Sequence, residues 1–167
     1  MSLFWINGGK MIKSKGWDWK IVKDDIDCPW KIPSVESYYL LNRWENLNFK
    51  NFLDLGCGLG RHTVLFAENG FNVSGFDISK EGIRKTKEWL KNLDLKADLK
   101  VGDMLELPYE NESFDCILCR NVISHQDTEG VKQIIKELYR VLKNNGECYL
   151  TLGSKSTWGF KQDSWPL

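Results

Sequence analysis

The chain has 167 residues, of which 42% are hydrophobic and 28% charged, and its 23 Lys and Arg balance its 23 Asp and Glu. This length suits one domain that buries its own core and leaves no room for a second catalytic domain. A formal charge of zero provides no basic field for nucleic acid, so we expect no nucleic-acid partner.

Membrane and secretory features are missing from the sequence. No apolar run approaches the roughly 20 residues that a membrane helix needs, and the N-terminus does not have the pattern of a signal peptide. The five cysteines do not suggest a disulfide framework. We therefore expect a cytoplasmic protein with no membrane contact.

Residues 1–33 differ from the rest of the chain. They show no sustained periodicity and contain Gly8-Gly9, Gly16 and two prolines, which is typical of irregular structure. We divide the chain into an aromatic N-terminal arm, 1–33, and a domain, 34–167. The arm either forms a lid over a ligand site or is pinned to the core by its aromatic side chains, and both remain open. Five of the eight tryptophans lie within the first 44 residues: Trp5, Trp17, Trp19, Trp30 and Trp44.

From residue 34 onward, short apolar segments alternate with helical ones. Strands are expected at 52–55, 72–76, 98–101, 114–119 and 147–152. Helices are expected from Ser34 to Trp44, from the glycines after the first strand to Asn69-Gly70, from Ser79 onward, and along the apolar stripe from Val131 to Leu142, ending at Asn144-Asn145-Gly146. The segment 102–113 is short for a crossover, so we expect a loop or a single helical turn. The alternation predicts an α/β fold with a mostly parallel sheet and helices on both faces.

Two helix faces carry specific expectations. In the first helix, Val35, Tyr38, Tyr39 and Trp44 fit one apolar face, although loosely. Basic side chains from the helix that follows Ser79 alternate with acidic ones, which favours a solvated face over a binding patch. They are Arg84, Lys85, Lys87, Lys91, Lys96 and Lys100.

The most informative segment is Asp54-Leu55-Gly56-Cys57-Gly58-Leu59-Gly60, between the first strand of the domain and its helix. Open α/β sheets bind ligands at the carboxyl ends of their strands, where glycine lets the backbone approach a ligand and a helix N-terminus offers unpaired N–H groups. The third glycine comes one residue earlier than in the dinucleotide fingerprint G-x-G-x-x-G. Asp77 follows the second strand, 21 residues beyond Gly56, where a carboxylate can accept from ribose hydroxyls. The spacing predicts a nucleoside-bearing cofactor; the alternative for Asp77 is a turn residue before the helix.

Five motifs together resemble one known family. They run from Phe52 to Gly60, Phe76 to Ser79, Gly102 to Met104, Phe114 to His125 and Arg140 to Glu147. In this order they are similar to the class I S-adenosylmethionine-dependent methyltransferases, and most similar to the small-molecule branch called methyltransferase type 11. The resemblance covers about residues 34–153. It implies a Rossmann-like, doubly wound sheet, with five of the usual seven strands present, and S-adenosylmethionine as the cofactor.

The resemblance also implies roles for the matching residues. Asp54 would help to hold the amino group of the cofactor, and Asp77 would accept from its ribose hydroxyls. Ile78 would pack on the adenine, Asp103 would accept from the adenine amino group, and Met104 would lie against the ring. The methionine part would face the backbone of the glycine loop and of the end of the fourth strand, at Gly56, Cys57, Gly58, Gly60, Cys119 and Arg120.

The cysteines and histidines of the chain are weaker indications of a functional site. Cys116 and Cys119 have C-x-x-C spacing, but residues i and i+3 of a strand point to opposite faces, so the pair cannot share a metal ion or a disulfide. His125 follows the fourth strand, where a methyl acceptor would enter, and is a weak candidate for a general base; the alternative is a loop histidine with no catalytic role. His62 and His125 are the two histidines, and no acid pair or metal-ligand spacing accompanies them. Neither a hydrolase nor a metal centre is indicated.

The sequence therefore predicts methyl transfer from S-adenosylmethionine to a small-molecule acceptor, which it does not identify. One alternative is a non-catalytic module that binds S-adenosylmethionine. The other is a nucleotide-dependent oxidoreductase, which the early third glycine disfavours. In the resembling fold two antiparallel strands follow the fifth, and too few residues follow here for both. We accordingly expect 147–152 to be an exposed sheet edge through which two copies form a homodimer.

Overall fold

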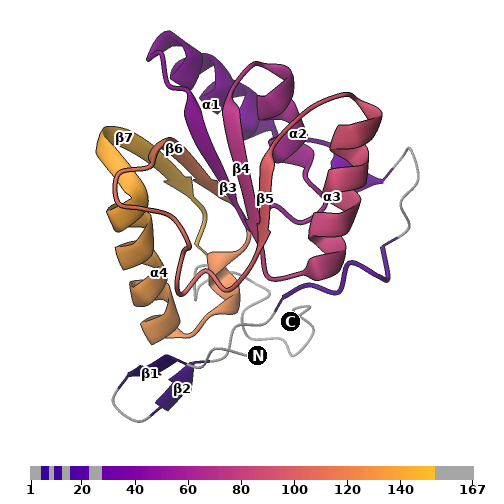
Figure 1. Ribbon diagram of the computed structural model, residues 1–167. Helices are drawn as coiled ribbons and strands as arrows, with labels where there is room; N and C mark the ends of the chain where they lie inside the picture. Colours follow the sequence, from indigo (N-terminus) through magenta and orange to yellow (C-terminus); the bar gives the residue numbers. More distant parts are fainter. Residues whose placement is uncertain (1–4, 8–9, 13–15, 23–27, 153–167) are drawn as a thin grey trace.

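The computed structural model describes residues 5–7, 10–12, 16–22 and 28–152, and a five-stranded parallel sheet forms its centre (Figure 1). The strands lie in the order β5-β4-β3-β6-β7, so β3 is central and the chain adds strands first on one side of it and then on the other. This arrangement confirms the doubly wound α/β fold. The strands are β3 Asn51–Leu55, β4 Asn72–Asp77, β5 Asp98–Val101, β6 Phe114–Cys119 and β7 Leu142–Leu150.

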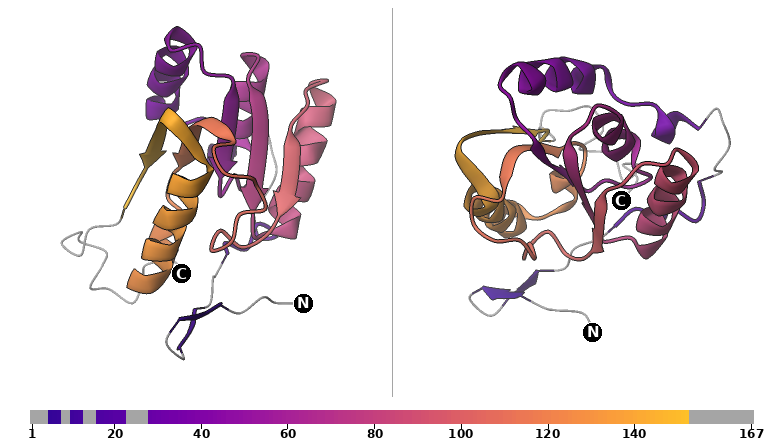
Figure 2. Two further views of the ribbon diagram at one scale, coloured as in Figure 1. Left: turned by 60° about the vertical axis from the view of Figure 1, so that its left-hand side comes forward. Right: turned by 45° about the horizontal axis from the view of Figure 1, so that its top comes forward.

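Helices cover both faces of this sheet, as expected (Figure 2). On one face lie α1 Val35–Asn46, α2 Arg61–Glu68 and α3 Lys80–Asn92, and on the other lies α4 Thr128–Val141. The segment 102–113 is a loop without regular structure, which agrees with its length. Among the described helices, none combines the length and the apolar composition that a membrane span requires.

Strand alternation divides the core into two layers. Leu53 and Leu55 of β3 face α4 and its Ile134 and Leu138, while Phe52 of the same strand faces the layer of α1 and α2. The two cysteines of β6 follow the same rule, because Cys116 belongs to the α1 layer and Cys119 to the α4 layer. The C-x-x-C pair is therefore split by the sheet, as its spacing predicts.

The end of α4 differs from the expectation. The helix ends at Val141, and β7 begins at Leu142 instead of residue 147. Phe114 pairs with Leu142 whereas Cys116 pairs with Glu147, so the register shifts across residues 143–146. The Asn-Asn-Gly sequence that predicts a helix end thus forms an irregularity inside the strand, with Asn145 at a φ of 65°.

The N-terminal arm is less irregular than expected. β1 Trp5–Asn7 and β2 Lys10–Ile12 pair antiparallel, with Asn7 opposite Lys10, and a 3-10 turn, η1, spans Pro29–Lys31. Strands of three residues are too short to show an alternating pattern. A pair of glycines between two short segments, here Gly8-Gly9, is nevertheless a hairpin signal that does not depend on periodicity.

The buried face of α1 also differs from the expectation. Its buried side chains are Ser37, Leu40, Leu41 and Trp44, whereas Val35, Tyr38 and Tyr39 are exposed. The apolar residues Val35, Tyr38 and Tyr39 lie on the side of the helix opposite the buried one, so a count of apolar positions selects the wrong face.

His62 at the start of α2 holds the start of α1. The backbone N–H of Ser34, the N-cap of α1, donates to His62 Nε2 at 3.3 Å. Burial, assisted by the positive charges of Arg61 and Arg120, lowers the pKa of His62 to about 3. The ring is therefore a neutral acceptor near pH 7.

We predict that Phe66→Ala lowers the free energy of unfolding by about 3–5 kcal/mol, because it leaves a cavity in the α1 layer. Phe66 is fully buried, and its ring stacks on Phe52 with centroids 3.9 Å apart. Urea unfolding measures the change. The control is Tyr139→Ala on α4, where the side chain is 84% exposed and the expected change is within about 0.5 kcal/mol. Equal losses for both variants would contradict this packing.

A second prediction concerns acid stability. Between pH 6.5 and about 3 the unfolded state binds a proton at His62 that the folded state excludes, so this residue makes folding weaker as pH falls through that window. The complete effect is on the order of 4–5 kcal/mol. His62→Gln keeps an acceptor without a titrating group, and its stability should fall less steeply with acid than that of the wild type. Parallel pH profiles in chemical denaturation would refute the assignment.

Candidate functional site

Three glycines shape the loop between β3 and α2. Gly56, Gly58 and Gly60 have φ values of 75°, 57° and 86°, in the left-handed region that a side chain strains. The loop is attached to the neighbouring strand, because the N–H groups of Gly56 and Cys57 both donate to the Phe76 carbonyl, at 2.7 and 3.2 Å. The glycine loop therefore lies at the carboxyl ends of β3 and β4, the edge at which the sequence places a ligand.

Asp77 joins this loop to the start of α3. Its Oδ2 accepts from the N–H of Gly58 at 2.8 Å, and its Oδ1 accepts from the N–H of Ser79 at 2.7 Å. Burial raises the pKa of the carboxyl, while these two bonds favour its charged form. The Ser79 bond is the turn contact that the alternative interpretation predicts. A carboxylate offers about four acceptor positions, so two remain for a ligand, and the ribose role stays a prediction.

Asp54 is more deeply buried than its predicted role suggests. Its side chain lies under α2, is 2% exposed, and accepts from Thr63 Oγ1 at 2.7 Å. Burial raises its pKa to about 6, and the nearby Arg61 opposes this rise. Cys57 is buried beside it, and burial raises the pKa of its thiol well above the usual value. The buried thiol of Cys57 and the buried carboxyl of Asp54 therefore support the glycine loop structurally, and a contact of either residue with a ligand stays a prediction.

A cavity of about 330 Å³ lies at the carboxyl ends of β4 and β5. Asp103 lines it and also accepts from the Leu105 N–H at 3.0 Å. Met104 does not line it and is instead buried in the α4 layer of the core. The structure thus provides a largely apolar slot with the carboxylates of Asp103 and Glu106 at its wall, while contact of Met104 with a ring stays a prediction. The other lining residues are Phe76, Val101, Gly102, Leu105, Glu106, Leu107 and Pro108.

The opposite edge of the sheet has a wider depression of about 770 Å³, around the amino ends of the strands. It is larger but brings together none of the predicted site residues. We therefore place the functional site at the carboxyl edge.

At the end of β6, Cys119 is fully buried and Arg120 lies next to the first turn of α1. Arg120 Nε is 3.7 Å from Glu36 Oε2, and within the described part of the chain this nitrogen has no hydrogen-bond partner. Val122 fills the space against Gly56, where an added methyl group would lie 2.3 Å from its Cγ2. The end of β6 therefore meets the glycine loop, as the resemblance implies.

His125 ends the 3-10 turn η2, Ile123–His125, but the position of its side chain lies outside the described part of the structure. Its proposed role as a base is untested. Within the described residues, no group of three His, Cys, Asp or Glu side chains is placed to hold a metal ion.

Several residues at this edge were not found by sequence reasoning. Arg61 follows the last glycine directly, and burial lowers its pKa together with the charge of Arg120. Thr86 Oγ1 donates to the Gly58 carbonyl at 3.0 Å; its place on the apolar face of α3 was a usable signal. Trp19 packs on the loop; the lid interpretation of the arm includes this residue, but nothing in the local sequence indicates Gly58 as its contact.

Residues 52–146 match the model of a family described as a methyltransferase domain. Among curated proteins, the chain is similar to the demethylmenaquinone methyltransferase of Lactobacillus johnsonii, at 30% identity over 129 residues, which cover 70% of this chain and 52% of that protein. It is also similar to norajmaline N-methyltransferase of Rauvolfia serpentina, at 38% identity over 96 residues, which cover 55% of this chain and 32% of that protein. The chain spans about half, or less, of the length of these relatives.

The chain is also similar to solved structures, one of which is a methyltransferase. A SAM-dependent methyltransferase from Methanosarcina mazei has a TM-score of 0.57 and 34% identity, covering 60% of this chain and 50% of its own. The YcgJ protein of Bacillus subtilis has a TM-score of 0.61 and 25% identity, covering 67% and 47%. These findings confirm the Rossmann-like fold and support S-adenosylmethionine as the cofactor. Since the family model matches from β3 through the glycine loop to the start of β7, the chain belongs to the methyltransferase domain family.

Proposed function

We propose that this domain binds S-adenosylmethionine at the carboxyl edge of the sheet and transfers its methyl group to a small organic acceptor. The observation that carries the proposal is the pairing of two features at this edge. The left-handed glycine loop is fixed to Asp77, and the slot at the end of the next strand has Asp103 in its wall.

The residues present fit this cofactor. Adenine needs an apolar slot with an acceptor for its exocyclic amine, which the cavity and Asp103 offer. A ribose needs a buried acceptor, which Asp77 offers with its free acceptor positions. Left-handed glycines let a ligand approach the backbone without a Cβ in the way.

The cofactor supplies an electrophilic methyl group on a sulfonium. The work left to the protein is to align the acceptor with that methyl group and to exclude water, and it needs few catalytic side chains. Arg61, Arg120 and Glu36 surround the end of β6, so we assign this region to the acceptor and methionine side. The small-molecule class of the acceptor is supported by the names of the relatives, which act on demethylmenaquinone and norajmaline.

We expect Asp77→Ala to weaken binding of S-adenosylhomocysteine, the demethylated product, by about 1.5–3 kcal/mol, or roughly tenfold to a hundredfold. Isothermal calorimetry measures the affinity, and circular dichroism checks the fold. The matched control is Asp98→Ala on the neighbouring strand β5, whose carboxylate pairs with Lys100 at the surface. Unchanged affinity in Asp77→Ala would remove this residue from the site.

If His125 is the base, His125→Ala should lower turnover by roughly 10²–10⁴ without changing the affinity for S-adenosylhomocysteine. The acceptor is first identified by incubating the protein and S-adenosylmethionine with a metabolite extract and searching for a mass increase of one methyl group. Ser124→Ala, an exposed neighbour, is the control and should keep the wild-type rate. Full turnover by His125→Ala would make this histidine a loop residue without a catalytic role. A protein that binds the product but methylates nothing would favour the non-catalytic module.

A further inference from the structure

Residues 16–22 of the arm lie directly on the predicted cofactor surface. A methyl group added at Gly58 would lie 2.5 Å from Trp19 Cζ2, and one added at Gly82 would lie 3.0 Å from Trp19 Cδ1. One added at Gly16 would lie 2.4 Å from Ile78 Cγ2. The arm therefore touches the glycine loop through Trp19 and touches Ile78 through its own backbone.

These contacts leave no layer for a ligand. Atoms in van der Waals contact stand about 3.5–4 Å apart, and the indole of Trp19 already stands this close to the backbone of Gly58. Gly58 and Ile78 are the residues that we expect to contact the methionine part and the adenine of the cofactor. The arm in this position and a cofactor on those two residues exclude each other.

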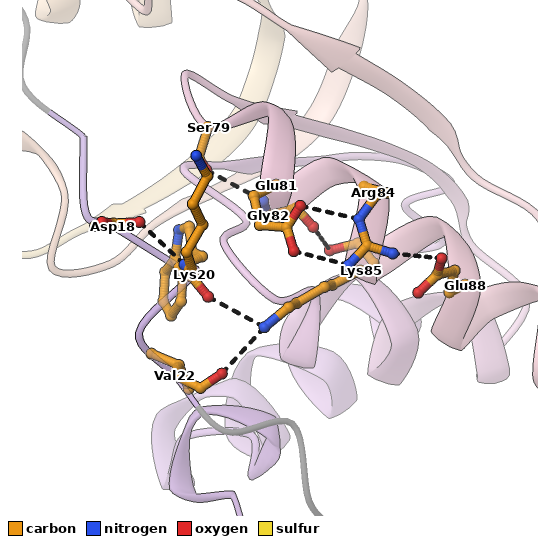
Figure 3. A network of polar contacts seen from close by, with 11 residues as sticks. Asp18, Lys20, Val22, Ser79, Glu81, Gly82, Arg84, Lys85 and Glu88 are labelled. Atoms are coloured by element: carbon orange, nitrogen blue, oxygen red, sulfur yellow. Dashed lines mark hydrogen bonds and ion pairs between the residues drawn. The ribbon is translucent and has the colours of Figure 1, made fainter.

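Lys85 of α3 holds the arm in place. Its Nζ donates to the carbonyls of Trp19 and Val22, both at 3.1 Å (Figure 3). The sequence predicts a solvated Lys85, and that expectation is wrong. Its neighbour Arg84 pairs instead with Glu81 and Glu88 on the outer side of the helix. The two adjacent basic residues therefore have different partners.

The other contacts of residues 16–22 are weak enough for this segment to leave the glycine loop. Trp19 and Trp17 both pack on Trp30, with ring centroids 5.7 and 5.8 Å apart. The buried Nε1 of Trp17 has no hydrogen-bond partner among the described residues, which weakens the packed state because a buried donor is left unsatisfied. Lys85 is partly exposed, so its bonds add only modest stability.

We propose that residues 16–22 form a strap that competes with the cofactor for the glycine loop, and that Lys85 is the positioning residue that latches it. The proposal rests on the proposed cofactor site. Because only the open form binds, the apparent dissociation constant is the intrinsic one divided by the open fraction. Weakening the latch therefore increases affinity, whereas a fixed wall of the site would lose affinity when its support is removed.

The test measures S-adenosylhomocysteine binding by calorimetry and by stopped-flow fluorescence. Lys85→Met keeps the length of the side chain and removes its donors, and Trp19→Ala removes the indole over Gly58. Both should bind at least about threefold more tightly and associate faster, because Lys85→Met removes two hydrogen bonds to the arm and Trp19→Ala removes the indole that packs on Gly58. Lys85→Arg should restore wild-type behaviour, and Lys87→Met, an exposed lysine on the same helix, should match the wild type. Equal or weaker binding by Lys85→Met and Trp19→Ala overturns the strap.

Hydrogen exchange gives an independent readout. Adding S-adenosylhomocysteine to the wild type should increase deuterium uptake in residues 16–22, because the strap leaves the loop. Decreased or unchanged uptake would overturn the proposal, since the segment would then stay in place over or beside the ligand. If the wild type binds and the variants show no gain, the strap fails and the cofactor site stands. If neither the wild type nor any variant binds S-adenosylhomocysteine, the proposed function itself fails.

Discussion

The carboxylate of Asp77 is the interaction on which the arrangement of the carboxyl edge depends. It accepts from Gly58 in the loop after β3 and from Ser79 at the cap of α3, and so ties together two segments that a flexible glycine loop would otherwise leave apart. The Phe76 carbonyl adds a second attachment to the same loop. Because burial opposes ionisation of Asp77, these backbone donors are what favour its charged form, and the shape of the loop and the charge of the site are maintained together.

Periodicity was sufficient for the elements whose burial is uniform along their length. The apolar stripe of α4 predicts its core face, with Ile134 and Leu138 in the observed layer, although Ile135 of the same stripe is 44% exposed. Apolar residues alone did not identify the buried face of α1, where Tyr38 and Tyr39 are exposed although the neighbouring Ser37 is buried. β7 begins within residues that read as a helix end, because Leu142 pairs with Phe114.

Some residues of the candidate site could likewise be predicted from the sequence, and others could not. The glycine loop and Asp77 could be predicted because the chemistry is carried by neighbouring residues at fixed spacing. The contact of Lys85 with Trp19 joins residues 66 positions apart, and locally a lysine beside glutamates reads as a solvated face. For Met104 the motif suggests a ligand contact, but the motif does not reveal that the side chain packs in the hydrophobic core. The spacing of glycines identifies a ligand-binding loop, but the fold decides which distant group a long side chain such as Lys85 contacts.

Every polar group of Gly58 is already in use. Its N–H donates to Asp77 and its carbonyl accepts from Thr86 Oγ1, and the indole of Trp19 occupies the space where a side chain at this position would lie. A ligand on this part of the loop can gain a hydrogen bond from Gly58 only at the second acceptor position of its carbonyl, and it competes with Trp19 through packing area. An indole is a large apolar surface, so displacing it requires a ligand that replaces that contact and gains polar bonds elsewhere. In this structure the sites for such bonds are the open acceptor positions of Asp77 and the wall of the neighbouring cavity at Asp103.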